Sequence, residues 1–204
     1  MDKENIMLKF IGILFFMLAL AAILNTLYQK NPEGTLWLCY TALFIISLGM
    51  IFKNDALIIS QLNILTIPLF VWIVDFFSYF YLGSSGQTLL GITEYMFTEG
   101  NVISKMISLQ HFFTIPFSLG VLSMIKAKRK YAWIVSFVQL VLFFAVSRLF
   151  TSPEKNINYV YRFAEYNLVS PHMYPLVWFA GFFVMVVITN VILERMFQER
   201  LTKI

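Results

Sequence analysis

Three residues in strongly apolar surroundings carry side chains that could do chemistry together: Thr41, Asp75 and His111. His111 interrupts the run ISLQHFFTIPFSLGVLSMI. An ionisable side chain in such a run indicates a function, because burying it in lipid is costly. A histidine can act as general base toward a hydroxyl nucleophile such as Thr41, while a carboxylate such as Asp75 orients the imidazole. We therefore interpret these three residues as candidate catalytic groups.

A second arrangement is open for Asp75. The carboxylate could instead form a structural ion pair with Arg148, which lies near the end of another apolar run. Such a pair would hold two helices together inside the membrane, where charged groups normally pair with one another. In that arrangement the chemistry would depend on Thr41 and His111 alone.

The elements that must position these residues are membrane-spanning helices. The chain is 59% hydrophobic and 13% charged, whereas a soluble domain has roughly a quarter of its residues charged. Apolar runs of roughly 20 residues are long enough to cross a bilayer as helices. The sequence therefore predicts an all-α polytopic membrane protein, a single domain over 1–204, with a six-helix bundle at about 8–28, 36–52, 56–81, 105–125, 131–150 and 173–193.

The distribution of positive charge predicts the orientation of this bundle. With the N-terminus inside, ten of the fifteen Lys and Arg residues fall on the inner side, including the run KAKRK at 126–130. Cytoplasmic loops carry such an excess, so we expect a multi-pass protein of the cell membrane with both termini cytoplasmic. We interpret the net charge of +4 as a sign of contact with anionic lipid headgroups and not of nucleic-acid binding.

Polar residues gather toward the outer side of the predicted bundle. Thr41, Asp75 and His111 each lie about six residues from an outer helix end, roughly 9 Å deep at about 1.5 Å per residue. The two long connections, 82–104 and 151–172, emerge on the same side. Such a layer suits a membrane lipid whose ester lies near the headgroups. The side chains near this layer that we expect to bind substrate are Gln110, Thr114, Ser78 and Arg148.

Helical spacing places several of these residues on one face. Ser104, Ser108, His111, Thr114 and Ser118 recur at intervals of three and four residues. This stripe should face the interior of the bundle, because lipid cannot satisfy its hydrogen bonds. An alternative is that the stripe only joins helices, since small and hydroxyl residues line many helix interfaces in membranes.

Neither a metal nor a cofactor is predicted. The chain has one cysteine, Cys39, and two histidines, which give no zinc-ligand spacing. No Gly-rich phosphate loop or other cofactor motif is found.

Two segments resemble the androgen-induced and androgen-dependent-TFPI-regulating proteins, a family of multi-pass hydrolases of fatty acid esters of hydroxy fatty acids. The segment 37–41, Trp-Leu-Cys-Tyr-Thr, is similar to that family's Trp-x-x-x-Thr, and 111–117 is similar to its His-x-x-x-x-Pro-Phe. The resemblance implies that Thr41 is the nucleophile and His111 the base. The chain departs from the family at Phe44, where the family has an aspartate.

Two other classes of protein would use the same residues differently. A transporter or lipid-binding module would use the outer polar layer as its pocket. A transporter would also need an inner gate, for which the inner half offers little beyond Gln61, Asn63 and Gln139. A structural or assembly subunit would use the polar stripe as an interface. The oligomeric state is left open by the sequence.

Overall fold

The computed structural model describes residues 3–82, 87–127, 131–163 and 169–198. Its elements in chain order are α1 (Lys3–Tyr28), η1 (Pro32–Leu36), α2 (Leu38–Ile51), α3 (Asp55–Leu82), η2 (Glu94–Met96), α4 (Val102–Ser108), α5 (Gln110–Met124), α6 (Ala132–Phe150), η3 (Ile157–Tyr159) and α7 (Tyr174–Gln198).

Five helical stretches of the described chain are long and apolar enough to cross a membrane: α1, α3, α4 with α5, α6 and α7. These spans make the chain a multi-pass helical membrane protein, as its composition predicts. The second predicted span, 36–52, is shorter than expected. It holds the 14-residue helix α2, preceded by the short helix η1. The fourth, 105–125, begins earlier, at Val102, and is interrupted at Leu109 between α4 and α5.

Apolar side chains cover the outside of the bundle and polar side chains lie within it. Phe10 of α1 is 60% exposed and Leu176 of α7 is 63% exposed, while Gln61 and Asn63 of α3 are fully buried. A water-soluble protein shows the opposite arrangement, because charged and amide side chains are mostly exposed in water. The outer surface therefore fits contact with lipid.

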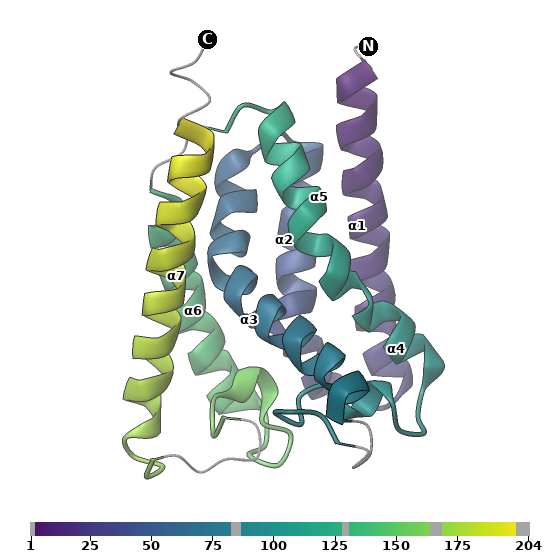
Figure 1. Ribbon diagram of the computed structural model, residues 1–204, viewed down its shortest axis with the longest axis vertical. Helices are drawn as coiled ribbons and strands as arrows, with labels where there is room; N and C mark the ends of the chain where they lie inside the picture. The colour runs from purple at the N-terminus through teal and green to yellow at the C-terminus, as the bar shows by residue number, and fades with distance from the viewer. Residues whose placement is uncertain (1–2, 83–86, 128–130, 164–168, 199–204) are drawn as a thin grey trace.

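Helix α3 lies at the centre of the bundle and contacts α2, α5, α6 and α7. Every residue from Ile58 to Leu65 is buried, so this stretch of α3 has no lipid-facing side. Pro68 lies inside the helix, where the missing backbone N–H weakens the hydrogen-bond ladder. Figure 1 shows α3 changing direction along its length.

Buried amides connect α3 to α6 and α7. Gln61 and Gln139 exchange two hydrogen bonds of 2.8 Å through their side-chain amides. The Asn63 amide donates to Ser136 Oγ at 3.3 Å and to Asn190 Oδ1 at 3.1 Å. These contacts give the amide groups in the middle of an apolar run partners other than water, although Asn63 Oδ1 is left buried and unpaired.

Helices α1 and α2 approach closely at a glycine. A Cβ atom built on Gly12 would lie 2.8 Å from Ile51 Cγ1 and 3.1 Å from the backbone oxygen of Ser47. Small residues allow membrane helices to approach closely and gain van der Waals contact. Gly12 therefore sets the distance between these two helices.

The bundle has two different ends (Figure 1). One, here called the terminal end, carries the first turn of α1, the α2–α3 turn and the last turn of α7. The other, here called the loop end, carries η1, η2 and η3, with the connections that follow α3 and α6. The predicted outer side corresponds to the loop end.

Candidate functional site

Asp75 anchors the loop that follows α3. Its carboxylate is fully buried and accepts four hydrogen bonds. Leu90 N–H donates to Oδ1 at 2.6 Å. Oδ2 accepts from the Thr88 hydroxyl at 3.1 Å and from both Thr93 N–H and its hydroxyl, at 2.7 and 2.8 Å. These donors satisfy both oxygens of the buried carboxylate.

These partners correct the pairing expected for Asp75 from the sequence. Within the described chain, Asp75 forms neither a hydrogen bond to His111 nor an ion pair with Arg148. The physical reason is local: loop N–H groups near the carboxylate satisfy it. Ser78, expected to bind substrate, belongs to the same anchor, since its hydroxyl donates to Asp75 O and accepts from Leu89 N–H.

Arg148 lies in a different part of the loop end. Its guanidinium carbon is 4.5 Å from the centre of the Tyr161 ring and 5.4 Å from that of Phe144. The Tyr161 hydroxyl donates to the Arg148 backbone oxygen at 3.1 Å. Cation–π contacts therefore hold this charge among aromatic rings of α6 and the loop after it.

Asn158 anchors the second loop and was missed in the sequence. Its Oδ1 accepts from Leu38 N–H at 2.7 Å, at the start of α2, and its amide donates to Leu36 O and Ser147 Oγ. The Trp178 indole donates to its backbone oxygen at 3.1 Å. Its left-handed φ of 55° is a conformation that asparagine tolerates better than most residues. One asparagine thus joins α2, α6 and α7.

His111 faces the interior of the bundle without a full set of partners. Its side chain is 8% exposed, and its ring centroid lies 4.6 Å from that of Trp72 on α3. Nδ1 is sealed from solvent and has no hydrogen-bond partner of normal geometry, although the Ser108 backbone, one turn earlier, interacts with the ring. An unsatisfied buried polar atom costs about 1–3 kcal/mol, so this nitrogen is a candidate contact for a bound molecule.

The helical turns beside His111 contain further unpaired polar atoms. Gln110 Nε2 and Ser118 Oγ are both buried without a partner. Thr114, between them, donates to the Gln110 backbone oxygen at 2.9 Å. Gln110, Thr114 and Ser118 follow one another at intervals of four and share a face of α5. The predicted stripe is therefore buried from Ser108 onward, while Ser104 is partly exposed, and its unpaired atoms lie on one helix.

A chain of hydrogen bonds lies next to this face. The Trp72 indole donates to the Tyr95 hydroxyl at 3.3 Å, and that hydroxyl donates to Ser108 Oγ at 2.9 Å. Although part of the Tyr95 ring is exposed, burial raises the pKa of Tyr95, which keeps its hydroxyl protonated as a donor. One turn earlier, Ser104 Oγ accepts from the Asn25 amide of α1 at 2.9 Å. The α4 part of the stripe therefore joins helices.

Thr41 lies in the first turn of α2 and is half-buried. Its backbone N–H donates to Trp37 O at 3.3 Å. The described chain contains no hydrogen bond between the Thr41 hydroxyl and His111, whose Nδ1 is unpaired. Three of the seven predicted site residues lie together on α5: Gln110, His111 and Thr114. The other four make their described contacts elsewhere: Thr41, Asp75, Ser78 and Arg148. The roles assigned to all seven stay predictions.

The described residues contain no group of three His, Cys, Asp or Glu side chains that could hold a metal ion. No protein-family model, curated protein or solved structure matches this chain.

Proposed function

We propose that the protein binds a membrane lipid through a carbonyl-bearing polar group that lies against α5. The observation that carries this proposal is the pair of unpaired buried atoms on adjacent residues, Gln110 Nε2 and His111 Nδ1. The amide nitrogen can only donate, whereas the imidazole nitrogen can donate or accept according to its tautomer. A lipid ester or carboxyl group would supply the missing oxygen.

The surroundings of these atoms fit a lipid. Phe113 and Phe117, three and seven residues after Gln110 on the same helix, are 55% and 47% exposed. A lipid would therefore keep its chain on the apolar surface and insert only its polar group. In line with the charge distribution, we also propose that the terminal end faces the cytoplasm, so this site belongs to the outer half of the membrane.

Native mass spectrometry of the detergent-purified protein can test carbonyl recognition. Two ligands would be compared: 1-oleoylglycerol, which has an ester carbonyl, and 1-O-oleylglycerol, the ether that lacks it. One hydrogen bond of about 1 kcal/mol predicts about five-fold tighter binding of the ester. The Gln110→Met variant should lose this preference.

Thr189→Val is the matched control, because Thr189 Oγ1 on α7 is also buried and unpaired. This variant should keep the preference for the ester. Equal binding of ester and ether by the wild-type protein would reject the proposal.

A second proposed function is hydrolysis of the bound ester, with Thr41 as nucleophile and His111 as base. The specific observation in its favour is that His111 Nδ1 is buried and forms no hydrogen bond to another side chain. Thr41 Oγ1 would bond to the carbonyl carbon while its proton passes to His111. The ester C–O bond would then break, the leaving alkoxide would take that proton, and water would release the acyl group. This step requires Thr41 Oγ1 and His111 to come within about 3 Å of each other or to share one bridging water.

Labelling with a fluorophosphonate tests this step independently of binding. The wild-type protein and Thr41→Ser should be labelled, and Thr41→Ala should not. Labelling that persists in Thr41→Ala would reject Thr41 as nucleophile while leaving the lipid-binding proposal standing.

A further inference from the structure

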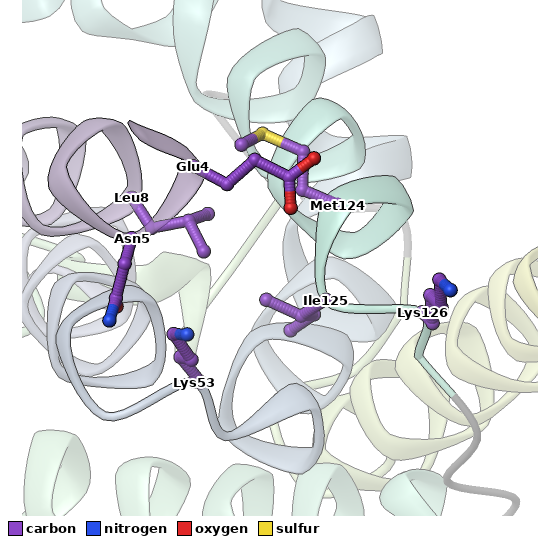
Figure 2. A pocket seen from close by; sticks show the side chains of 7 residues that line it. All are labelled: Glu4, Asn5, Leu8, Lys53, Met124, Ile125 and Lys126. Carbon is purple, nitrogen blue, oxygen red and sulfur yellow. The ribbon is translucent and has the colours of Figure 1, made fainter. Parts of the chain in front are cut away.

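A cavity of about 250 Å³ opens at the terminal end of the bundle, far along the helices from the loops. Figure 2 shows side chains of α1 on one side of it and side chains from the end of α5 on the other, with the α2–α3 turn below. At roughly 30 Å³ per water, the space holds about eight water-sized groups. The residues that line it are Glu4, Asn5, Leu8, Lys53, Met124, Ile125 and Lys126.

Two lysines at this cavity occupy equivalent places at two helix ends. Lys53 follows the end of α2 and Lys126 follows the end of α5, with left-handed φ values of 55° and 53°. In this conformation the chain turns out of the helix at a defined point. No hydrogen bond or ion pair joins either ammonium group to another described residue. Two positive charges therefore border the cavity without a counter-charge from α2 or α5.

Acceptors lie on the α1 side of the same cavity. The Asn5 Oδ1 atom is sealed from solvent and has no hydrogen-bond partner. Glu4, beside it in sequence, forms no ion pair with Lys53, Lys126 or any other residue of the described chain. A buried amide oxygen without a donor is costly, so the cavity calls for a ligand with N–H or O–H groups. Positive groups on one side and acceptors on the other suit a ligand with both signs of charge.

Apolar side chains complete the lining. Leu8 is 2% exposed, and Met124 and Ile125 are half-buried. The cavity is therefore polar at its charged rim and apolar beneath. Its position at the ends of α1, α2 and α5 corresponds to the depth of the lipid headgroups, which lie just outside the hydrocarbon core.

We propose that this cavity binds the headgroup of a phosphoethanolamine lipid. Lys53 and Lys126 contact the phosphate, and Glu4 and Asn5 accept hydrogen bonds from the primary ammonium. A phosphocholine group has no N–H to offer Asn5 Oδ1, and a phosphoglycerol group has no positive charge for Glu4. The site is separate from Gln110 and His111 on α5, so it does not depend on the proposed carbonyl site.

Native mass spectrometry with lipids of identical acyl chains can test this assignment. Dioleoyl phosphatidylethanolamine, phosphatidylcholine and phosphatidylglycerol would each be titrated, with soluble phosphoethanolamine as a fourth ligand. Phosphatidylethanolamine should bind most tightly, and the soluble headgroup should bind much more weakly because it lacks the chains. Lys53→Gln and Lys126→Gln should each weaken the binding of phosphatidylethanolamine about five-fold. Asn5→Leu should remove the preference over phosphatidylcholine, and Glu4→Gln should remove the preference over phosphatidylglycerol.

Lys9→Gln is the matched control. Lys9 is exposed on α1, near the same end, but does not line the cavity. This variant removes the same charge and should leave the preference intact. Equal affinity for the three lipids, or an equal loss of affinity in Lys9→Gln, would overturn the assignment. Binding of soluble phosphoethanolamine as tight as that of the lipid would overturn the lipid as its source.

Discussion

The carboxylate of Asp75 accepts hydrogen bonds from both the backbone N–H and the hydroxyl of Thr93, at 2.7 and 2.8 Å. This contact returns the loop after α3 to the helix that it leaves. Asn158 does the same for the loop after α6, since its amide donates to Ser147 Oγ on α6, and its Oδ1 also accepts from the backbone at the start of α2. Both long connections at the loop end are therefore anchored by a buried side chain with several partners.

Asp75→Asn should destabilise the protein, because the amide nitrogen presents donors where N–H and hydroxyl groups need acceptors. Hydrogen bonds to a charged group contribute about 1.5–3 kcal/mol each, so we expect a loss of about 2 kcal/mol or more. Thermal unfolding in detergent measures the loss. Glu99→Gln, an exposed change in the same loop, is the control and should have little effect. Equal stability of Asp75→Asn and the wild type would contradict the anchor.

Two substitutions at Asn158 separate backbone conformation from hydrogen bonding. Asn158→Gly keeps the left-handed φ accessible but removes the side-chain contacts to Leu36, Leu38 and Ser147. Asn158→Ala removes the contacts and also strains the backbone. Both variants should unfold at lower temperature than the wild type, and Asn158→Ala should be the less stable by about 1 kcal/mol. The reverse order would mean that the left-handed conformation is not required.

The reciprocal amide pair of Gln61 and Gln139 should behave as a coupled unit. Either single change to Leu leaves one buried amide without its partner, at a cost of about 1–3 kcal/mol. The double variant removes both amides. Its loss of unfolding free energy should be smaller than the sum of the losses in the two single variants. A double-mutant cycle on free energies of unfolding measures this coupling. Strict additivity would show that the two amides act independently.

Gly12→Ala and Gly120→Ala make the same chemical change in opposite settings. The new methyl group of Gly12→Ala would lie 2.8 Å from Ile51 Cγ1, whereas nothing lies within 4 Å of the corresponding position at Gly120. Overpacking at Gly12 should destabilise by about 1–3 kcal/mol. Gly120→Ala should be neutral or stabilise by up to about 1 kcal/mol through helix propensity. Thermal unfolding of the two variants side by side gives the comparison.

Gln110→Met should not destabilise the lipid-free protein, although Gln110 is buried. The Nε2 atom has no partner to lose, and Oε1 has only a long contact of 3.5 Å with the Thr114 hydroxyl, which also donates to the Gln110 backbone oxygen. An apolar side chain of similar size therefore removes a cost of about 1–3 kcal/mol. Thermal unfolding after exhaustive detergent exchange, which removes bound lipid, is the measurement. A clear loss of stability in the lipid-free state would indicate that Gln110 has a structural partner instead of a ligand.

The stripe on α4 and α5 illustrates how far spacing alone reaches. The intervals of three and four correctly predict that Ser108, His111, Thr114 and Ser118 are buried on one side. They do not predict that Ser108 is bonded to Tyr95 while Ser118 has no partner. Tyr95 comes from a loop, and no periodic pattern indicates where a loop residue will lie. Asn25, which bonds to Ser104, was also missed in the sequence. The signal that could have revealed it is an amide side chain inside the first apolar run.

The sequence by itself determined the class of the protein, since the transfer of a 20-residue apolar run into lipid depends on that run alone. It also determined which polar residues must face inward, because lipid satisfies none of them. Only the tertiary structure decided the partners. Asp75 is bonded to Thr93 and Gln61 to Gln139, at separations of 18 and 78 residues. Hydrogen bonds are short and directional, so these pairings depend on helix rotation and loop path, which no run of residues contains.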